Sequence, residues 1–222
     1  MVRVLNVMLT MLLGAAAARA SPWWGAWNDG WPEEQGWTRY SSDPPAERWL
    51  EDGKLFIDSR ADWFIYDEYG QLRPGEMTLG WQETFVAHWV VKVDDIIPTG
   101  SEVPGLAVSS DDQWDVFFTL GVDRISSVYE PGTWAPFAPG QFHELWLESS
   151  DMRTYTLSID GTPSLEGSFF QSLFYLPGVC WGDMTSHRSL SEWDYVECGI
   201  TPEPSSLLCV LAALCVCRPV RT

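Results

Sequence analysis

The chain has 222 residues, with 31 acidic side chains against 13 Lys and Arg, so its formal net charge is −18. A surface this acidic repels phosphate backbones, which excludes nucleic acid as a favoured partner and argues against direct electrostatic binding to anionic lipid. The length fits one domain with terminal segments, and the 14 Trp, 10 Phe and 7 Tyr favour strands.

Residues 1–20 have the layout of a secretory signal peptide. Arg3 supplies positive charge before an apolar stretch, and Ala18 and Ala20 form a small-x-small cleavage site before Ser21. The apolar stretch is shorter than the roughly 20 residues that a membrane-spanning helix needs, which favours a cleaved signal over an uncleaved anchor. We therefore expect an N-terminal signal helix and export.

Residues 21–37 form a lead-in rich in Trp, Gly and Pro. Aromatic rings of this kind can stack on sugars, but Trp is also abundant throughout the chain. We expect an irregular segment whose rings pack on the following domain. Its tryptophans are Trp23, Trp24, Trp27, Trp31 and Trp37.

Short stretches of strand-forming residues, separated by turn residues, follow from residue 38 onward. Glu51-Asp52-Gly53 is a hairpin turn signal. The longest stretch, residues 83–93, is apolar on both faces, which is typical of a central strand of a sandwich. The expected strands before residue 140 are residues 48–50, 54–58, 63–69, 83–93, 105–109, 113–120 and 124–128.

Residues 141–170 contain the clearest antiparallel pattern. Apolar and polar side chains alternate through residues 154–160, which is the period of a half-buried strand. Asp160-Gly161 follows as a two-residue turn, because Gly adopts a positive φ without steric cost. A strand before it, residues 143–148, and a third after it complete a meander. Strands over residues 178–183 and 192–198 close the domain.

The sequence therefore predicts an all-β, two-sheet antiparallel sandwich, with helical pattern confined to the two termini. Residues 155–170 resemble the Asp-Gly hairpin of concanavalin A-like and laminin-G-like jelly rolls. Cys180-Trp181-Gly182-Asp183 and Glu192-Trp193-Asp194-Tyr195-Val196 resemble the closing strand pair of those domains. The resemblance implies a jelly roll over residues 38–200, a fold shared by lectins, sugar-binding modules and some hydrolases, and it does not fix the function.

The C-terminal residues 201–222 carry a Pro-Glu-Pro motif (Pro202, Glu203, Pro204), an apolar run and a basic end. This order resembles the PEP-CTERM sorting tail of exported bacterial proteins. In that family an exosortase, a membrane transpeptidase, recognises and processes the tail. The resemblance thus implies exosortase as a partner and transient membrane contact through a short C-terminal hydrophobic helix. It also implies a final location at the cell surface or outside the cell.

Two features depart from the usual tail. The apolar run covers about eleven residues, 207–217, which is shorter than the segment typical of the family, and Arg218 and Arg221 flank a Pro instead of forming an Arg run. A hydrophobic tail that simply packs or anchors is therefore the alternative.

Cys180 and Cys198 lie in the last two expected strands. In an exported protein two such cysteines form a candidate disulfide, because strands that pair or face each other can bring the Cα atoms within the allowed ~4.4–6.8 Å. Two buried thiols are the alternative. The other cysteines, Cys209, Cys215 and Cys217, lie in the tail and are expected to be apolar fillers, with lipidation as the alternative.

One catalytic pattern is present. Glu192-x-Asp194-x-x-Glu197 matches the spacing in laminarinase-like jelly-roll glycosidases, where the first Glu resembles a nucleophile and the last an acid/base. On a regular strand Glu192 and Glu197 point to opposite faces, so a bulge would be required. The pattern also lies in the last strand instead of mid-domain. We therefore expect an exposed strand face and assign no catalytic residue.

Aspartates cluster in two places and supply the oxygen ligands that calcium prefers. They have no ligand loop of defined spacing, so we predict no cofactor or metal site and keep calcium as an alternative. These residues are Asp94, Asp95, Asp111, Asp112 and Asp115.

Together these features predict an exported surface or matrix protein that is not an enzyme and whose exposed aromatic side chains bind extracellular polysaccharide. A purely structural surface protein and a jelly-roll glycosidase are the alternatives. Aromatic rings exposed in a line on one sheet would favour sugar binding.

Overall fold

The computed structural model describes residues 25–61, 65–96, 104–121, 123–138, 140–171, 177–184 and 188–202, without the side chains of Asp95, Ile96 and Pro202. The expected signal helix, its cleavage site, Glu203, Pro204 and the C-terminal helix lie outside this part of the chain. Within the part that the structure describes, no helix is long and apolar enough to cross a membrane.

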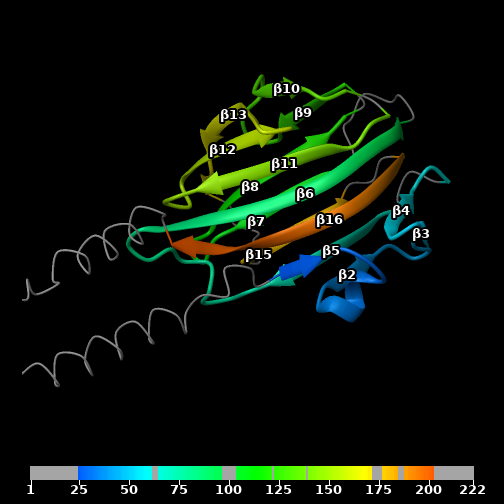
Figure 1. Cartoon of the computed structure of the whole chain (residues 1–222), viewed down its shortest axis with the longest axis horizontal. Helices are drawn as coiled ribbons and strands as arrows, with labels where there is room; N and C mark the ends of the chain where they lie inside the picture. The colour runs from blue at the N-terminus through cyan, green and yellow to red at the C-terminus, as the bar shows by residue number, and fades with distance from the viewer. Residues whose placement is uncertain are drawn as a thin grey trace, which may run out of the picture.

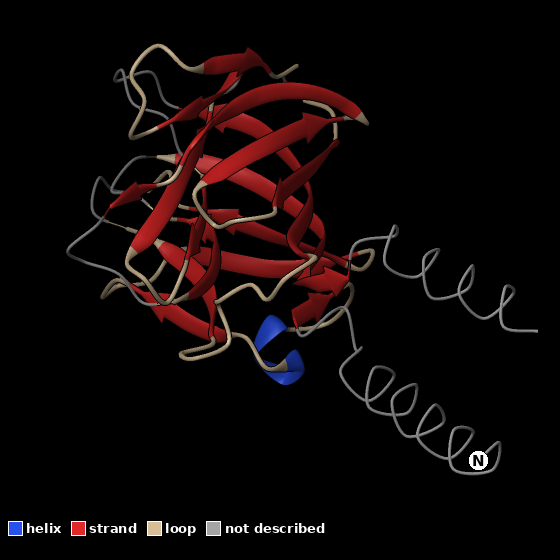
Figure 2. Ribbon diagram, turned by 90° about the vertical axis from the view of Figure 1, so that its left-hand side faces the viewer, coloured by secondary structure: helices blue, strands red, loops and turns tan. Residues whose placement is uncertain are grey.

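Two antiparallel sheets of eight strands each stack face to face (Figures 1 and 2). The first, sheet A, has the strand order β13-β12-β11-β6-β16-β4-β3, and β1 also pairs with β16. Its strands are β1 (Gly25–Trp27), β3 (Glu47–Glu51), β4 (Lys54–Asp58), β6 (Glu83–Ile96), β11 (His143–Ser149), β12 (Thr154–Ile159), β13 (Thr162–Ser168) and β16 (Ser189–Pro202).

The second, sheet B, has the strand order β10-β9-β8-β7-β15-β5-β2, and β14 also pairs with β8. Figure 1 shows sheet B behind sheet A. Its strands are β2 (Thr38–Ser41), β5 (Asp67–Leu72), β7 (Gly105–Ser109), β8 (Trp114–Leu120), β9 (Arg124–Ser127), β10 (Trp134–Pro136), β14 (Phe170–Gln171) and β15 (Gly178–Asp183).

The core lies between the sheets, and Trp181 on β15 is at its centre. Its ring centroid is 4.9 Å from that of Tyr69, 5.0 Å from that of Trp193 and 5.3 Å from that of Trp27. Trp193 lies on β16 of sheet A, so this aromatic cluster joins the two sheets. Aromatic rings bury large apolar areas, and their mutual packing adds to the stability from burial alone.

The lead-in contributes to this core. Trp27 and Trp37 are buried, as the sequence predicted for its rings. The segment is not irregular, however, because it contains β1 and a 3-10 helix over Pro32–Gln35. Pairing with the long strand β16 gives Gly25–Trp27 its strand geometry.

Both predicted hairpin turns are confirmed. Asp160 and Gly161 have φ values of 51° and 75°, and Asp52 and Gly53 have 51° and 79°. Two consecutive positive φ values match the type I′ turn, whose twist fits antiparallel strands. Among the described residues, the strand predicted over residues 63–69 begins at Asp67 and continues past residue 69 as β5 (Asp67–Leu72).

The remaining differences from the sequence prediction arise from pairing. Strand β16 is longer than predicted because it pairs with β6 over the whole length from Ser189 opposite Ile96 to Pro202 opposite Glu83. Four strands were not predicted: β1, β2, β10 and β14. Each has four residues or fewer. Such segments are too short to show a period of their own, and a longer neighbour fixes their conformation.

Candidate functional site

The outer face of sheet B has a floor of small side chains with aromatic rings on both sides. Alternate residues of each strand point into the core, including Leu106, Phe118 and Val179, so the residues between them point outward. One outward row crosses seven strands through Trp134, Ser126, Thr119, Gly105, Gly182, Glu68 and Tyr40. The next row runs through Phe117, Ala107, Cys180, Gly70 and Thr38.

A groove of about 540 Å³ lies over this floor. Tyr40 forms one wall, and Phe117 and Tyr129 form the other. Ala107 and Cys180 lie between the walls. This volume falls in the range of about 300–1,000 Å³ that is usual for ligand sites. Tyr40 lies over Gly70 and Phe117 over Gly105, so these rings border the floor from both sides.

Glycine is required in this floor for two reasons. A Cβ on Gly70 would lie 3.1 Å from both Cys180 Sγ and Tyr40 Cε2, closer than ordinary contact. Gly182 has a φ of 122°, and a Cβ there would lie 2.7 Å from the backbone oxygen of Asp67. Any larger residue at these positions would raise the floor or strain the backbone.

Glu68 is the acidic group of this floor and is half-buried. Burial, and to a lesser extent the charge of Asp67, raises the pKa of Glu68 to about 7. The carboxyl group of Glu68 forms no hydrogen bond or ion pair with any residue in the part of the chain that the structure describes. A carboxyl group in this state can donate a hydrogen bond near neutral pH.

A second carboxyl group, that of Asp115, lies at the opposite wall. The Tyr129 hydroxyl donates to Asp115 Oδ2 at 3.0 Å, and burial followed by the charge of Asp115 raises the pKa of Tyr129 to about 12. The Tyr129 ring stacks on Phe170 with centroids 4.9 Å apart. Phe170 is 51% exposed and Trp134 is 54% exposed, so rings are accessible along this side of sheet B.

The predicted disulfide is wrong, because Cys180 and Cys198 are both free thiols. Cys180 lies on β15 of sheet B and lines the groove, whereas Cys198 lies on β16 of sheet A and is fully buried in the core. The prediction required strands that pair or face each other. The two strands lie in opposite sheets, but Cys180 points to the outer face of sheet B, since its neighbours Val179 and Trp181 point into the core, whereas Cys198 points inward. Burial raises the pKa of the Cys180 thiol to about 12.

The glycosidase-like carboxyl groups lie on the other side of the molecule, on sheet A. The bulge that they require is present, because the register of β16 against β6 shifts between Trp193 and Tyr195. Glu192 and Glu197 therefore share the outer face of sheet A. The sequence predicted that only a bulge would bring both glutamates to one face, and β16 contains that bulge.

The two carboxyl groups nevertheless bind different partners. Glu192 forms an ion pair with Lys92, and Glu197 Oε1 lies 3.3 Å from His88 Nδ1. Lys92 and His88 are four residues apart on β6, which separates these pairs by about 13 Å along the strand. Each carboxyl group is directed at the residue opposite it on β6, and the Tyr195 hydroxyl also donates to Glu197.

The aspartates considered for calcium have protein partners. Asp111 accepts hydrogen bonds from the backbone nitrogens of Gly75 at 2.7 Å and Met77 at 2.9 Å. Asp112 pairs with Arg153 at 2.9 Å, and Asp94 pairs with Lys92 at 3.0 Å. Among the residues that the structure describes, no three His, Cys, Asp or Glu side chains are grouped so as to hold a metal ion.

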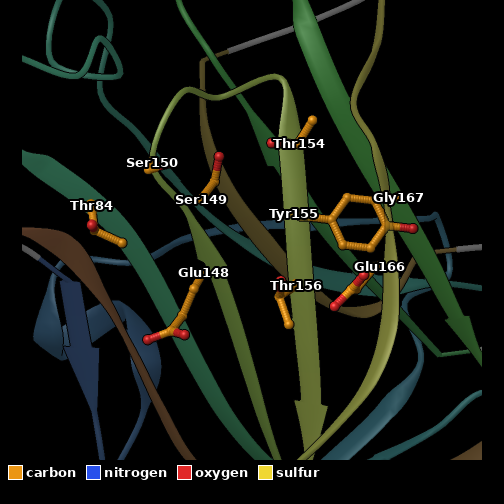
Figure 3. Close-up of a pocket in the computed structure, with 9 residues that line it drawn as sticks. All are labelled: Thr84, Glu148, Ser149, Ser150, Thr154, Tyr155, Thr156, Glu166 and Gly167. Carbon is orange, nitrogen blue, oxygen red and sulfur yellow. The ribbon is translucent and has the colours of Figure 1, made fainter.

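A further hollow of about 540 Å³ lies at the edge of sheet A beside the β11–β12 turn (Figure 3). Glu148, Thr156 and Glu166 form one cross-strand row there. Tyr155 points away from that row toward Gly167, as Figure 3 shows, and is buried. This hollow is lined by hydroxyl and carboxyl groups and offers no exposed ring face, so we regard the groove of sheet B as the candidate site.

The sequence did not identify Tyr40, Glu68 or Phe117 as site residues. A signal was present, because outward positions of neighbouring strands carry glycine where a strand usually has larger residues. These glycines are Gly70, which is two residues after Glu68 on β5, and Gly182, which is two residues after Cys180 on β15. Recognising the floor required the pairing of β5, β15 and β7, which the sequence does not specify.

No family model matches the chain, and no curated protein matches it either. Solved structures do share its fold. A carbohydrate esterase of the Shiga toxin-encoding bacteriophage phi24B is 13% identical, covering 76% of this chain and 92% of that chain, with a TM-score of 0.54. The metal-free lectin I-B4 of Griffonia simplicifolia is 9% identical, covering 79% and 98%, with a TM-score of 0.53.

A protein of unknown function from Shewanella oneidensis MR-1 is 12% identical, covering 79% of this chain and 85% of that chain, with a TM-score of 0.52. At these identities the similarity concerns the fold. The expected two-sheet antiparallel jelly-roll sandwich is thereby confirmed as the fold.

Proposed function

We propose that this protein is a non-catalytic carbohydrate-binding β-sandwich that holds an extended polysaccharide in the groove of sheet B. The observation that carries the proposal is the floor of small residues between Tyr40 on one side and Phe117 and Tyr129 on the other. Ring faces bind the apolar faces of sugar rings, and flanking polar groups bind their hydroxyls. The fold that the chain shares with a lectin and a carbohydrate esterase agrees with this role.

A cleaving enzyme is the competing function, because an acid with a pKa near 7 such as Glu68 suits general acid catalysis. Glycoside hydrolysis uses a second carboxyl group at most about 9.5 Å away. Asp115 is the other carboxyl group of the groove, and it lies three strands from Glu68, at least about 14 Å away. The geometry therefore favours binding without cleavage.

The test is binding to a broad panel of immobilised glycans. We expect the full-length protein to bind at least one linear polysaccharide, and Y40A and F117A each to weaken that binding about fivefold or more, since one lost ring contact is worth about 1 kcal/mol. F56A is the matched control, because Phe56 stacks on Trp49 on the outer face of sheet A. Equal loss in F56A, or no binding by the folded protein, would contradict the proposal.

We also propose export and exosortase sorting, with a final location at the cell surface or outside the cell. The support comes from residues 1–20 and from the Pro202, Glu203, Pro204 motif with its apolar run and basic end. The intact mass of the protein recovered from its native host tests this. Loss of residues 1–20 and of the residues after the motif is expected, and an intact tail would contradict sorting.

A further inference from the structure

We propose that the groove of sheet B selects uncharged polysaccharide chains and that Glu68 makes its affinity fall as the pH rises through neutrality. This inference rests on the proposed carbohydrate-binding function. It names the class of ligand and the group that regulates the site.

The charged residues that line the groove determine which class of chain it accepts. Glu68 and Asp115 are the charged residues among those described that line the groove, and no Lys, Arg or His joins them. An acidic polysaccharide, such as a uronate or a sulfated chain, would meet the Asp115 carboxyl group and, above about pH 7, an ionised Glu68 in a groove whose described lining has no basic side chain. Like charges brought together in a partly desolvated site oppose binding.

The described groups that face Glu68 in the groove are neutral or negatively charged near pH 7. Tyr40 faces it from β2 and Cys180 from β15, and both are neutral near pH 7, since burial raises the pKa of each. Asp67 precedes it on β5 and points to the other side of the sheet, where Arg39 pairs with it. Asp115 on β8 adds a further negative charge across the groove. None of these groups stabilises an ionised Glu68 directly.

Ligand binding in the groove is linked to the protonation of Glu68. A sugar chain lying over Glu68 removes the remaining water from its carboxyl group, which disfavours the ionised form further. The protonated form is neutral and can donate a hydrogen bond to a sugar hydroxyl. Since the pKa of Glu68 is already raised to about 7, the ligand binds the protonated form and takes up a proton where Glu68 was ionised.

The size of the effect follows from the fraction that is protonated. If only the protonated form binds, affinity falls about tenfold between pH 6 and pH 8 for a pKa of about 7. The substitution E68Q keeps the shape and a hydrogen-bond donor but cannot ionise. It therefore fixes the site in a state like the low-pH form.

The experiment measures affinity by calorimetry for the full-length protein, using neutral glucan, xylan, mannan and galactan oligosaccharides beside oligouronates of equal length. We expect neutral chains to bind about tenfold more tightly at pH 6 than at pH 8, and E68Q to bind equally at both. Oligouronates should bind weakly throughout. The control E144Q removes one negative charge from the outer face of sheet A, where Glu144 is 48% exposed, and should keep the pH dependence.

Three results would overturn the inference while leaving carbohydrate binding intact. They are an affinity for neutral chains that does not change with pH, a pH dependence that survives in E68Q, and oligouronates that bind as well as neutral chains. A folded protein that binds no oligosaccharide at either pH would instead remove the proposed function itself. A carbon-13 titration of the Glu68 carboxyl group, with and without ligand, adds a direct readout, because its pKa should rise on binding.

Discussion

The outer faces of the two sheets treat polar groups in opposite ways. On sheet A the charged side chains bind one another: Lys92 pairs with Glu192 and Asp94, and His88 lies between Glu144 at 3.1 Å and Glu197. The rings there cover one another too, since Trp146 stacks on His88 with centroids 4.0 Å apart and Trp49 stacks on Phe56 at 4.9 Å.

On sheet B the arrangement is open. Glu68 has no basic partner among the described residues, Gly182 lies opposite it on β15, and the rings of Tyr40 and Phe117 lie on opposite sides of the floor. A face whose groups satisfy one another gains stability from them, whereas a face that leaves a floor empty and a carboxyl group unpaired gives up stability and gains space for a ligand. The difference favours sheet B as the face of the proposed binding site.

The largest effect should come from the core that both faces share. W181A removes the ring that contacts Trp27, Tyr69 and Trp193. Replacing a buried Trp by Ala lowers the free energy of unfolding by about 3–5 kcal/mol. Urea denaturation followed by near-ultraviolet circular dichroism measures the loss. A loss below about 1 kcal/mol would mean that the aromatic cluster does not hold the sheets together.

Filling the floor of sheet B should lower carbohydrate affinity, whereas the same side chain added to sheet A should not. In G70V the added Cβ lies 3.1 Å from the ends of two side chains, which can shift, and Gly70 does not need a positive φ. We expect carbohydrate affinity to fall more than tenfold while the free energy of unfolding falls by about 1–3 kcal/mol. S158V places the same side chain on the outer face of sheet A, beside Trp146, and should leave affinity unchanged.

Retained affinity in G70V, measured by the same calorimetry, would mean that the ligand does not use this floor. Equal loss in both variants would mean that the effect comes from altered packing rather than from the groove.

The fold could be predicted because its signals are local. The alternation in residues 154–160 and the turns at Asp52-Gly53 and Asp160-Gly161 depend on residues close in sequence, and each specifies a strand or hairpin without knowledge of its neighbours. In β6 apolar residues on both faces predicted a central strand, and Val86 is buried on the outer side while Phe85 and Trp89 lie in the core.

The site could not be predicted because its signals are non-local. Glu68, Gly182 and Gly105 meet only through the pairing of β5, β15 and β7, which are far apart in sequence. The glycosidase-like spacing of Glu192 and Glu197 was visible in the sequence, but the partners that hold those groups, Lys92 and His88, lie about 100 residues earlier. The pairing of distant strands decides which carboxyl group is satisfied and which is free.

The unpaired state of Glu68 should also be measurable without a ligand. Its pKa is about 7 in the folded protein against an ordinary value of 4.5, so the folded state keeps a proton that the unfolded chain releases in this window. The stability from this group is complete below pH 4.5 and is lost as the pH rises through 7. We therefore expect E68Q to match the natural protein at pH 4 and to be more stable at pH 8.

The gain at pH 8 should be on the order of 1 kcal/mol, because solvent in the open groove reduces the effect of burial. Urea denaturation at the two pH values measures it, and E144Q on sheet A controls for the change in net charge. A gain of the same size at pH 4, or a similar gain at pH 8 in E144Q, would show that the ionisation of Glu68 is not its cause.

The smallest effect concerns the length of the groove. Trp134 ends the outward row that begins at Tyr40, six strand spacings away, which is roughly 29 Å. If a polysaccharide follows the row, W134A should weaken binding of chains that span this distance by a few fold, in line with about 1 kcal/mol for one exposed ring contact. Short chains that contact only the floor near Glu68 should bind equally well.

W81A is the matched control, because Trp81 is 88% exposed in the loop between β5 and β6 and lies outside the row. Calorimetry with a series of increasing chain length separates the cases. An effect of W134A that is the same at every length would place Trp134 beside the floor in solution, whereas no effect at any length would limit the site to the groove between Tyr40 and Phe117.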